Sequence, residues 1–149
     1  MLNMDETFFL EAVREAGACT HNRFYNVGAV IVQGGIVVAR AHNEEDPELG
    51  HAEAIAIGRA KHKSPDLSGA TLYVTMVPCD YRKSGKISCC QRIIEAGIVK
   101  VAYCLDDTLR TPLSDGPSIL KGKGIEVIQM NQLKEICIRE TYKNIKTQG

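Results

Sequence analysis

The strongest constraint on this chain is a set of histidine and cysteine residues spread over three segments. His51 lies two residues before Glu53, Cys79 follows a proline, and the third segment carries the adjacent pair Cys89 and Cys90. The pattern predicts a helix from His51 onward, a strand before Cys79 and an amphipathic helix that opens at the last pair. A fold that brings these segments together could hold one metal ion, because imidazole and thiolate groups are ligands that zinc prefers.

The residue types fit a catalytic zinc site better than a structural one. Structural sites close four protein ligands around the ion, whereas catalytic sites keep three and a water molecule. We predict that His51, Cys79 and Cys89 hold one Zn²⁺ per chain, which lowers the pKa of a bound water toward neutrality. Glu53 would face the same pocket and act as a proton shuttle rather than a ligand. The same parts deaminate amino-substituted nucleobases.

A plainer interpretation needs no metal. The histidine could be a buried residue, the glutamate could lie on a helix surface, and the cysteines could belong to the core, since free cysteine is among the most buried residue types. Each short motif alone is a weak signal. Their order along the chain favours the metal site.

Length and composition limit the class of protein. The 149 residues predict one domain spanning 1–149, and 44% hydrophobic with 24% charged residues is ordinary for a globular chain. A formal net charge of zero disfavours a large nucleic-acid partner. No apolar run reaches membrane-spanning length, and the first residues do not resemble a signal peptide. Six cysteines without such a signal predict metal ligands and core thiols in a cytoplasmic protein.

Hydrophobic periodicity and turn signals predict alternating helices and strands. Gly34 and Gly35 predict a hairpin turn between the first two strands, and the later strands need helical crossovers and should run parallel. The order indicates an α/β fold of three layers, α-β-α, with a five-stranded mixed sheet and helices on both faces. Helices are expected over 5–17, 51–60, 89–96, 117–123 and 133–145, and strands over 27–32, 36–41, 71–76, 99–105 and 125–129.

The ordered motifs resemble those of the zinc-dependent cytidine/deoxycytidylate deaminase superfamily. The long insert between the two cysteine segments resembles the riboflavin-pathway pyrimidine deaminases, whose motif is Glu-Pro-Cys, a polar loop with a glycine and a basic residue, then Cys-Cys or Pro-Cys. The corresponding stretch here is 75–90, and the stretches 26–32 and 71–75 resemble the first and third strands of that family. The loop has the length found in the fungal enzymes, and the resemblance covers about residues 5–130.

The resemblance implies a cytidine-deaminase-like fold and helps to choose the third ligand. Such families carry this ligand five positions before the second of two apolar residues, with a glycine after the helix. Counting back from Ile94 indicates Cys89, and leaves Cys90 as a spare thiol beside the site. Two departures from the family pattern are Val77, where a glutamate is usual, and Ser88, where a proline is frequent.

The resemblance also implies a set of substrate-binding residues. Asn26 could recognise a pyrimidine ring, His42 could contact a sugar or base edge, and Ala52 lies inside the metal-binding tripeptide. Arg82 and Lys86, in the loop between the cysteine segments, could bind a phosphate. Each has a plainer alternative: a turn residue, a strand-end histidine without a role, or a solvated basic loop.

Together these features predict hydrolytic deamination of a small pyrimidine. The resemblance favours the phosphorylated ribosylamino or ribitylamino diaminopyrimidinone of riboflavin synthesis. The alternatives are cytosine, cytidine, a cytidine nucleotide or tRNA adenosine as the substrate, a non-catalytic zinc-binding partner subunit, or a zinc module without a pocket. The superfamily commonly forms oligomers, so the resemblance implies a homo-oligomer, with a dimer favoured, and no membrane partner.

Overall fold

The computed structural model describes residues 2–20, 25–43, 50–82, 84–107 and 113–144. They form a five-stranded sheet with the strand order β2-β1-β3-β4-β5. Strand β1 pairs antiparallel with both β2 and β3, while β3, β4 and β5 are parallel. The predicted mixed sheet is confirmed. The strands are β1 (Gly28–Gln33), β2 (Ile36–His42), β3 (Thr71–Val74), β4 (Lys100–Tyr103) and β5 (Glu126–Gln129).

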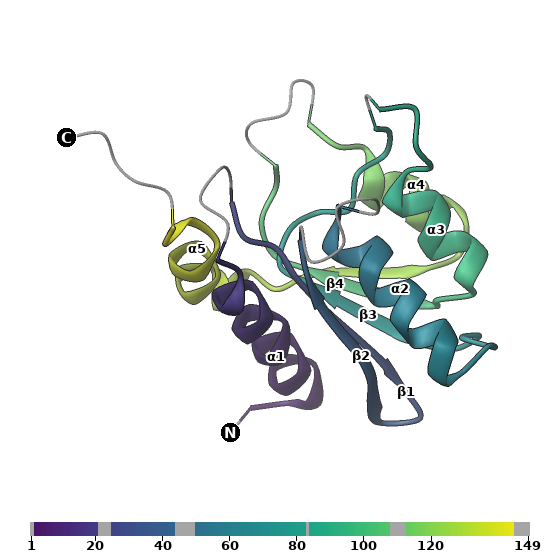
Figure 1. The fold of residues 1–149 in the computed structure, drawn as a ribbon, viewed down its shortest axis with the longest axis horizontal. Helices are drawn as coiled ribbons and strands as arrows, with labels where there is room; N and C mark the ends of the chain where they lie inside the picture. Colours follow the sequence, from purple (N-terminus) through teal and green to yellow (C-terminus); the bar gives the residue numbers. More distant parts are fainter. Residues whose placement is uncertain (1, 21–24, 44–49, 83, 108–112, 145–149) are drawn as a thin grey trace.

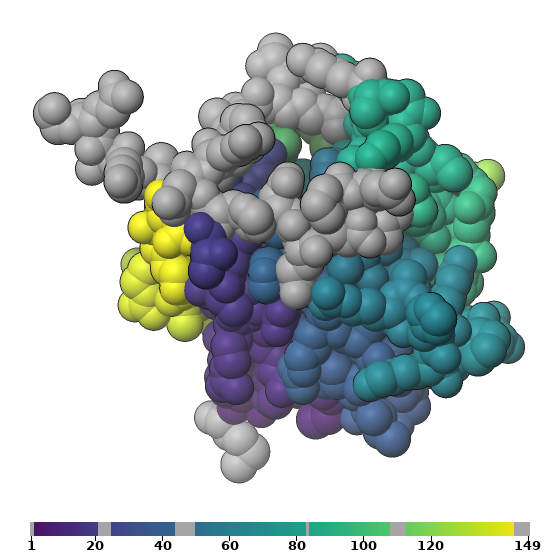
Figure 2. Space-filling view, in the orientation of Figure 1, coloured from purple at the N-terminus to yellow at the C-terminus, as the bar shows by residue number. Residues whose placement is uncertain are grey.

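Helices cover both faces of the sheet (Figure 1). One face carries α1 (Met4–Ala18) and α5 (Lys134–Tyr142), which also pack against each other. In the same orientation, Figure 2 shows purple α1 and yellow α5 side by side on one flank of the molecule. The other face carries α2 (Ala52–Lys63), α3 (Cys89–Ala96) and α4 (Gly116–Gly122). Two buried clusters result, one under each helical layer. The predicted α-β-α layering is therefore confirmed.

The hairpin between β1 and β2 follows from its two glycines. Gln33 pairs with Ile36, so only Gly34 and Gly35 form the turn. Their φ angles are 61° and 76°, and two successive positive values are what a type I′ turn requires. The hairpin places β2 at the edge of the sheet, and its end leads toward α2.

Strand β1 starts where helix α1 lies closest to the sheet. Gly28 has no room for a side chain, because a Cβ there would overlap the carbonyl oxygen of Ala12 and lie 2.5 Å from the backbone nitrogen of Ala16. Helix α1 begins with a capping box, in which Asn3 and Glu6 satisfy each other's backbone N–H groups. The close contact at Gly28 sets the position of the residues that precede β1.

The element bounds differ from those predicted mainly at the ends. Strand β3 ends at Val74, and Met76 forms an isolated parallel bridge with Leu105, so the chain leaves regular pairing just before Cys79. The stretch expected as one helix over 133–145 begins as a short 3₁₀ turn, Asn131–Leu133, and continues as α5 to Tyr142. The acidic stretch 44–49 lies outside the described residues. Across the ranges that are described, no helix is both long and apolar enough to span a bilayer.

Candidate active site

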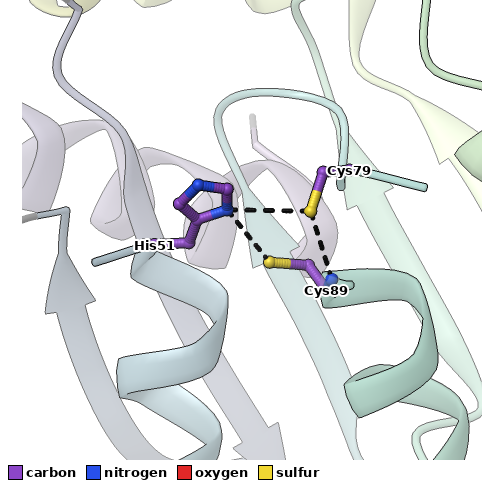
Figure 3. A group of neighbouring side chains, drawn as sticks. All are labelled: His51, Cys79 and Cys89. Carbon is purple, nitrogen blue, oxygen red and sulfur yellow. Dashed lines mark hydrogen bonds between the residues drawn. The ribbon is translucent and has the colours of Figure 1, made fainter. Parts of the chain in front are cut away.

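Three segments converge near the start of β1 and the end of β3. They bring the side chains of the predicted ligands together (Figure 3). His51 is the N-cap of α2, Cys79 lies in the segment after β3, and Cys89 is the first residue of α3. The Nδ1 atom of His51 lies 3.4 Å from the Sγ of Cys89 and 3.7 Å from the Sγ of Cys79. All three ligand atoms lie within 4.8 Å of one another.

These separations fit a zinc ion. With Zn–N of about 2.0–2.1 Å, Zn–S of about 2.3 Å and tetrahedral angles, an imidazole nitrogen and a thiolate sulfur on one ion lie about 3.6 Å apart. The two observed N–S distances, 3.4 and 3.7 Å, are close to that value. Cys90, the neighbouring thiol, instead points its Sγ toward the carbonyl of Pro78 at 3.9 Å. The geometry therefore groups Cys89, and not Cys90, with the other two ligands.

The start of helix α3 supports negative charge on the cysteine sulfurs. The backbone N–H of Cys89 donates to the Sγ of Cys79 at 3.2 Å, and the N–H of Cys90 donates to the Cys79 carbonyl at 3.1 Å. Ser88 caps the helix by accepting from the N–H of Gln91 at 3.1 Å. The N-terminal end of a helix carries partial positive charge, which stabilises a nearby anion.

The two sulfurs differ in how readily each loses its proton. Hydrogen bonding from Cys89, with a further contribution from His51, lowers the pKa of Cys79 to about 4 despite its burial. The same contact, together with burial and the nearby charge of Glu53, raises the pKa of Cys89. A single thiolate is therefore favoured by the protein alone, and a second one needs a cation between the sulfurs. This donor set is typical of a divalent metal site.

Glu53 lies in the first turn of α2, two residues after the ligand His51. It is the second residue of α2 and only 4% exposed, although it is charged in water. Burial raises its pKa to about 7, and the positive charge near His51 offsets only part of this effect. A carboxyl group with such a pKa can both accept and release a proton near neutral pH.

A cavity of about 250 Å³ opens beside Glu53 and the metal ligands. Its floor is the start of α2, and its walls come from the segments before β1, after β2, after β3 and after β4. Ala52, one of the predicted substrate-binding residues, lines this cavity. The lining consists of Tyr25, Val27, Asn43, Gly50, His51, Ala52, Glu53, Met76, Val77, Cys79 and Asp107.

Asn26 is not among the residues that line the cavity, and its predicted contact with a pyrimidine ring stays a prediction. Its backbone N–H donates to the carbonyl of Thr141 at 2.7 Å, and its side-chain amide donates to the carbonyl of Glu140 at 3.3 Å. Successive side chains of an extended segment point in opposite directions. Tyr25 and Val27 face the cavity, so the residue between them faces α5.

His42 is also absent from the cavity lining, and its predicted contact with a sugar or base edge stays a prediction. Its Nδ1 atom lies 3.3 Å from a carboxylate oxygen of Glu15 on α1. The cavity instead receives the next residue, Asn43, whose side-chain oxygen accepts from the N–H of Val27 at 2.8 Å and whose amide donates to the carbonyl of Tyr25 at 3.0 Å. The sequence analysis did not single out Asn43 as a cavity residue. Its only signal was an asparagine shortly after a predicted strand, next to His42, which was chosen instead.

The basic loop between the cysteine segments lies at the edge of the site. The guanidinium of Arg82 is near Gly50, since a Cβ on that glycine would be 3.4 Å from its Nη2 atom. The charge of Arg82 also acts on His51 and Cys89. Lys86 is exposed, and neither basic side chain is part of the cavity lining. A phosphate-binding role for this pair stays a prediction.

The ligand geometry agrees with comparisons against known proteins. The sequence model for the cytidine and deoxycytidylate deaminase zinc-binding region matches residues 2–105. The chain belongs to this deaminase family. The matched stretch contains the three predicted zinc ligands, Glu53 and every residue of the cavity lining except Asp107.

Relatives within the family include proteins of riboflavin synthesis and of tRNA modification. The chain is 36% identical over 142 residues to a diaminohydroxyphosphoribosylamino-pyrimidine deaminase of Schizosaccharomyces pombe, covering 93% of this chain and 35% of that protein. It is 39% identical over 83 residues to a tRNA-specific adenosine deaminase of Bacillus subtilis, covering 52% of each.

A solved structure shows the same fold. The diaminohydroxyphosphoribosylaminopyrimidine deaminase/5-amino-6-(5-phosphoribosylamino)uracil reductase of Thermotoga maritima matches with a TM-score of 0.77 and 34% identity, over 93% of this chain and 39% of that one. The chain thus spans about a third of the S. pombe protein and two fifths of the T. maritima one. Membership of the family confirms the predicted zinc-binding deaminase domain and its fold.

Proposed function

We propose that this domain catalyses the hydrolytic deamination of a small amino-substituted pyrimidine. The observation that carries the proposal is the burial of Glu53 beside three converging metal ligands at one end of a cavity. The volume of that cavity, about 250 Å³, is slightly below the range of about 300–1,000 Å³ that holds drug-sized ligands. A single pyrimidine ring with small substituents suits this space.

Each of the site residues has a role in this proposal. A zinc ion held by His51, Cys79 and Cys89 would supply Lewis-acid activation of a water molecule. Glu53 accepts one proton from the attacking water and passes it to the ring nitrogen, and then carries the remaining hydroxyl proton to the departing amine. The water oxygen replaces the amino group on the ring carbon, and ammonia leaves. Burial suits this role, since a pKa of about 7 lets Glu53 alternate between both states.

The proposed substrate is a diaminopyrimidinone that carries a ribosylamino or ribitylamino 5′-phosphate. The S. pombe and T. maritima relatives, both at more than 30% identity, are named for that pyrimidine chemistry. Ala52, the first residue of α2, contributes to the floor of the cavity against the ring. Arg82 and Lys86 lie in the segment between the two cysteine ligands, and their positive charges would bind the phosphate.

A tRNA adenosine substrate is the rival within the same chemistry. The B. subtilis relative favours it, but the match covers only 52% of this chain, and the formal net charge of zero offers no general attraction for RNA. A non-catalytic partner subunit is a further alternative, against which the presence and burial of Glu53 argue. We also propose that the chain acts as a single domain, in the cytoplasm, as a homo-oligomer with a dimer favoured.

A panel of substrates tests the proposal. Zinc-loaded protein is incubated with the ribosylamino and ribitylamino diaminopyrimidinone phosphates, their unphosphorylated forms, cytosine, cytidine, deoxycytidylate and an adenosine-bearing tRNA anticodon stem. Ammonia release is then measured. We expect turnover of the diaminopyrimidinones, with a lower KM for the phosphorylated forms. Release from the tRNA or from cytidine compounds alone would contradict the proposed substrate, and release from none would contradict the activity.

A further inference from the structure

Two cavity residues outside the metal site form a hydrogen-bonded pair that the proposed reaction does not use. The hydroxyl of Tyr25 donates to the Oδ2 atom of Asp107 at 2.8 Å, and both side chains line the cavity with Glu53 and Cys79. Tyr25 precedes β1, whereas Asp107 follows the bridge residue Leu105. The two residues join separate segments across one wall of the cavity.

The backbone around Tyr25 is held from two sides. Asn43 binds both the carbonyl of Tyr25 and the N–H of Val27 through its side-chain amide. Asn26, between them, binds the carbonyls of Glu140 and Thr141 near the end of α5 through its side chain and its backbone. The tyrosine ring therefore occupies a preset position, which avoids the entropic cost of ordering it when a ligand binds.

The pair presents hydrogen-bond acceptors to the cavity. Burial, followed by the hydrogen bond to Asp107, raises the pKa of Tyr25, so its hydroxyl keeps its proton and commits it to the carboxylate. The oxygen lone pairs of the hydroxyl then remain as acceptors. The carboxylate adds negative charge, which favours amino groups and disfavours a phosphate at this wall.

We propose that Tyr25 and Asp107 determine substrate specificity by accepting hydrogen bonds from exocyclic amines of the ring other than the amine that is removed. The inference rests on the proposed function and makes it more specific. It assigns the amine-bearing edge of the pyrimidine to the wall formed by Tyr25 and Asp107. The phosphate of a natural substrate is then directed to the side of the cavity near Arg82, whose charge has the opposite sign.

Binding of two small probes tests the assignment. The probe 2,5,6-triaminopyrimidin-4-one keeps two amines besides the one to be removed, and cytosine keeps none. Their affinities for the zinc-loaded protein are measured by anaerobic calorimetry, with ammonia followed in the same samples. Tyr25→Phe removes the hydroxyl and keeps the ring, while Asp107→Asn removes the charge and keeps the shape. Glu135→Gln, an exposed change on α5, is the control.

We expect each wall variant to weaken binding of the triamine by about tenfold, which is the effect of losing one hydrogen bond to a charged or charge-polarised group. Cytosine affinity should change by less than about twofold in the same variants, and the control should bind both probes as wild type does. The variants should keep the zinc content and melting temperature of the wild type to within a few degrees.

Three results would overturn the assignment: equal weakening of both probes, unchanged triamine binding, or a wild-type protein that does not bind the triamine. Its failure can be told apart from failure of the proposed function. If the wild type releases ammonia but the wall variants keep their preference, only the assignment is wrong. If the variants discriminate the probes as expected but no pyrimidine releases ammonia, the specificity assignment is supported and the proposed deaminase activity is contradicted.

Discussion

The backbone N–H of Cys89 lies 3.2 Å from the Sγ of Cys79, so the first residue of α3 holds the sulfur of the other cysteine ligand. The same residue also offers its own sulfur to His51 at 3.4 Å. One helix start therefore positions two of the three ligands. A shift at this point would disturb both, because the two roles come from one backbone position.

The adjacent cysteines should respond differently to substitution. Cys89→Ser should abolish most zinc binding, because a serine hydroxyl is a much weaker zinc ligand than a thiolate. Cys90→Ser should retain zinc, since that thiol contacts the carbonyl of Pro78 and not the other ligands. Elemental analysis of the purified variants measures this. Zinc retained in Cys89→Ser and lost in Cys90→Ser would reverse the ligand assignment.

Gly28 should tolerate no side chain. A Cβ at this position would overlap the carbonyl oxygen of Ala12, which belongs to the backbone of α1 and cannot rotate away. We expect Gly28→Ala to lower the free energy of unfolding by about 1–3 kcal/mol, the usual cost of overpacking. Urea denaturation measures the change. Gly122→Ala is the matched control, because a Cβ there meets nothing within 4 Å; an equal loss in both variants would refute the packing argument.

Asp5 should stabilise the fold in a pH-dependent way. Its carboxylate accepts from Lys100 at 2.8 Å and from the hydroxyl of Tyr73 at 2.7 Å. Partial burial raises the pKa of Asp5, but the bonds from Lys100 and Tyr73 together hold it below its usual value. A lowered folded-state pKa gives stability that is present above the unfolded-state pKa and lost as the pH falls through the folded-state value.

Asp5→Asn should therefore cost about 0.5–1 kcal/mol at pH 7, a modest amount because the pair is partly exposed and screened by solvent. The difference from wild type should shrink below about pH 4, where the carboxyl group protonates. Urea denaturation at pH 7 and at pH 3 measures both values. A difference that stays constant, or grows in acid, would be inconsistent with a charge-dependent role.

Local signals were sufficient to predict the elements and the metal ligands. The pattern that ends in Gly97 placed α3 at Cys89–Ala96, and that glycine adopts a φ of 80°, as a helix C-cap of this kind requires. His51 and Cys79 were predicted from ordered motifs at the ends of elements. These features depend on nearby residues or on a spacing, so they can be read from the sequence.

The cavity wall could not be predicted in the same way. Asn26 and His42 were each assigned to the cavity, but their neighbours Tyr25, Val27 and Asn43 line it. In an extended segment a shift of one residue reverses the face of every side chain. The pairing of Tyr25 with Asp107 joins residues 82 positions apart, and no local pattern reports such a contact. Tertiary structure was needed to find the lining residues and this pair.

Substitution of Glu53 is the most direct test of the central claim, that a buried carboxyl group beside the zinc ligands carries protons during deamination. Glu53→Gln keeps the size of the side chain and removes its ability to accept a proton. At equal zinc content, we expect ammonia release from the diaminopyrimidinone phosphate to fall by about 10²–10⁴-fold, the usual contribution of a general acid–base group. A Glu53→Gln protein that matched the wild-type rate would contradict the account.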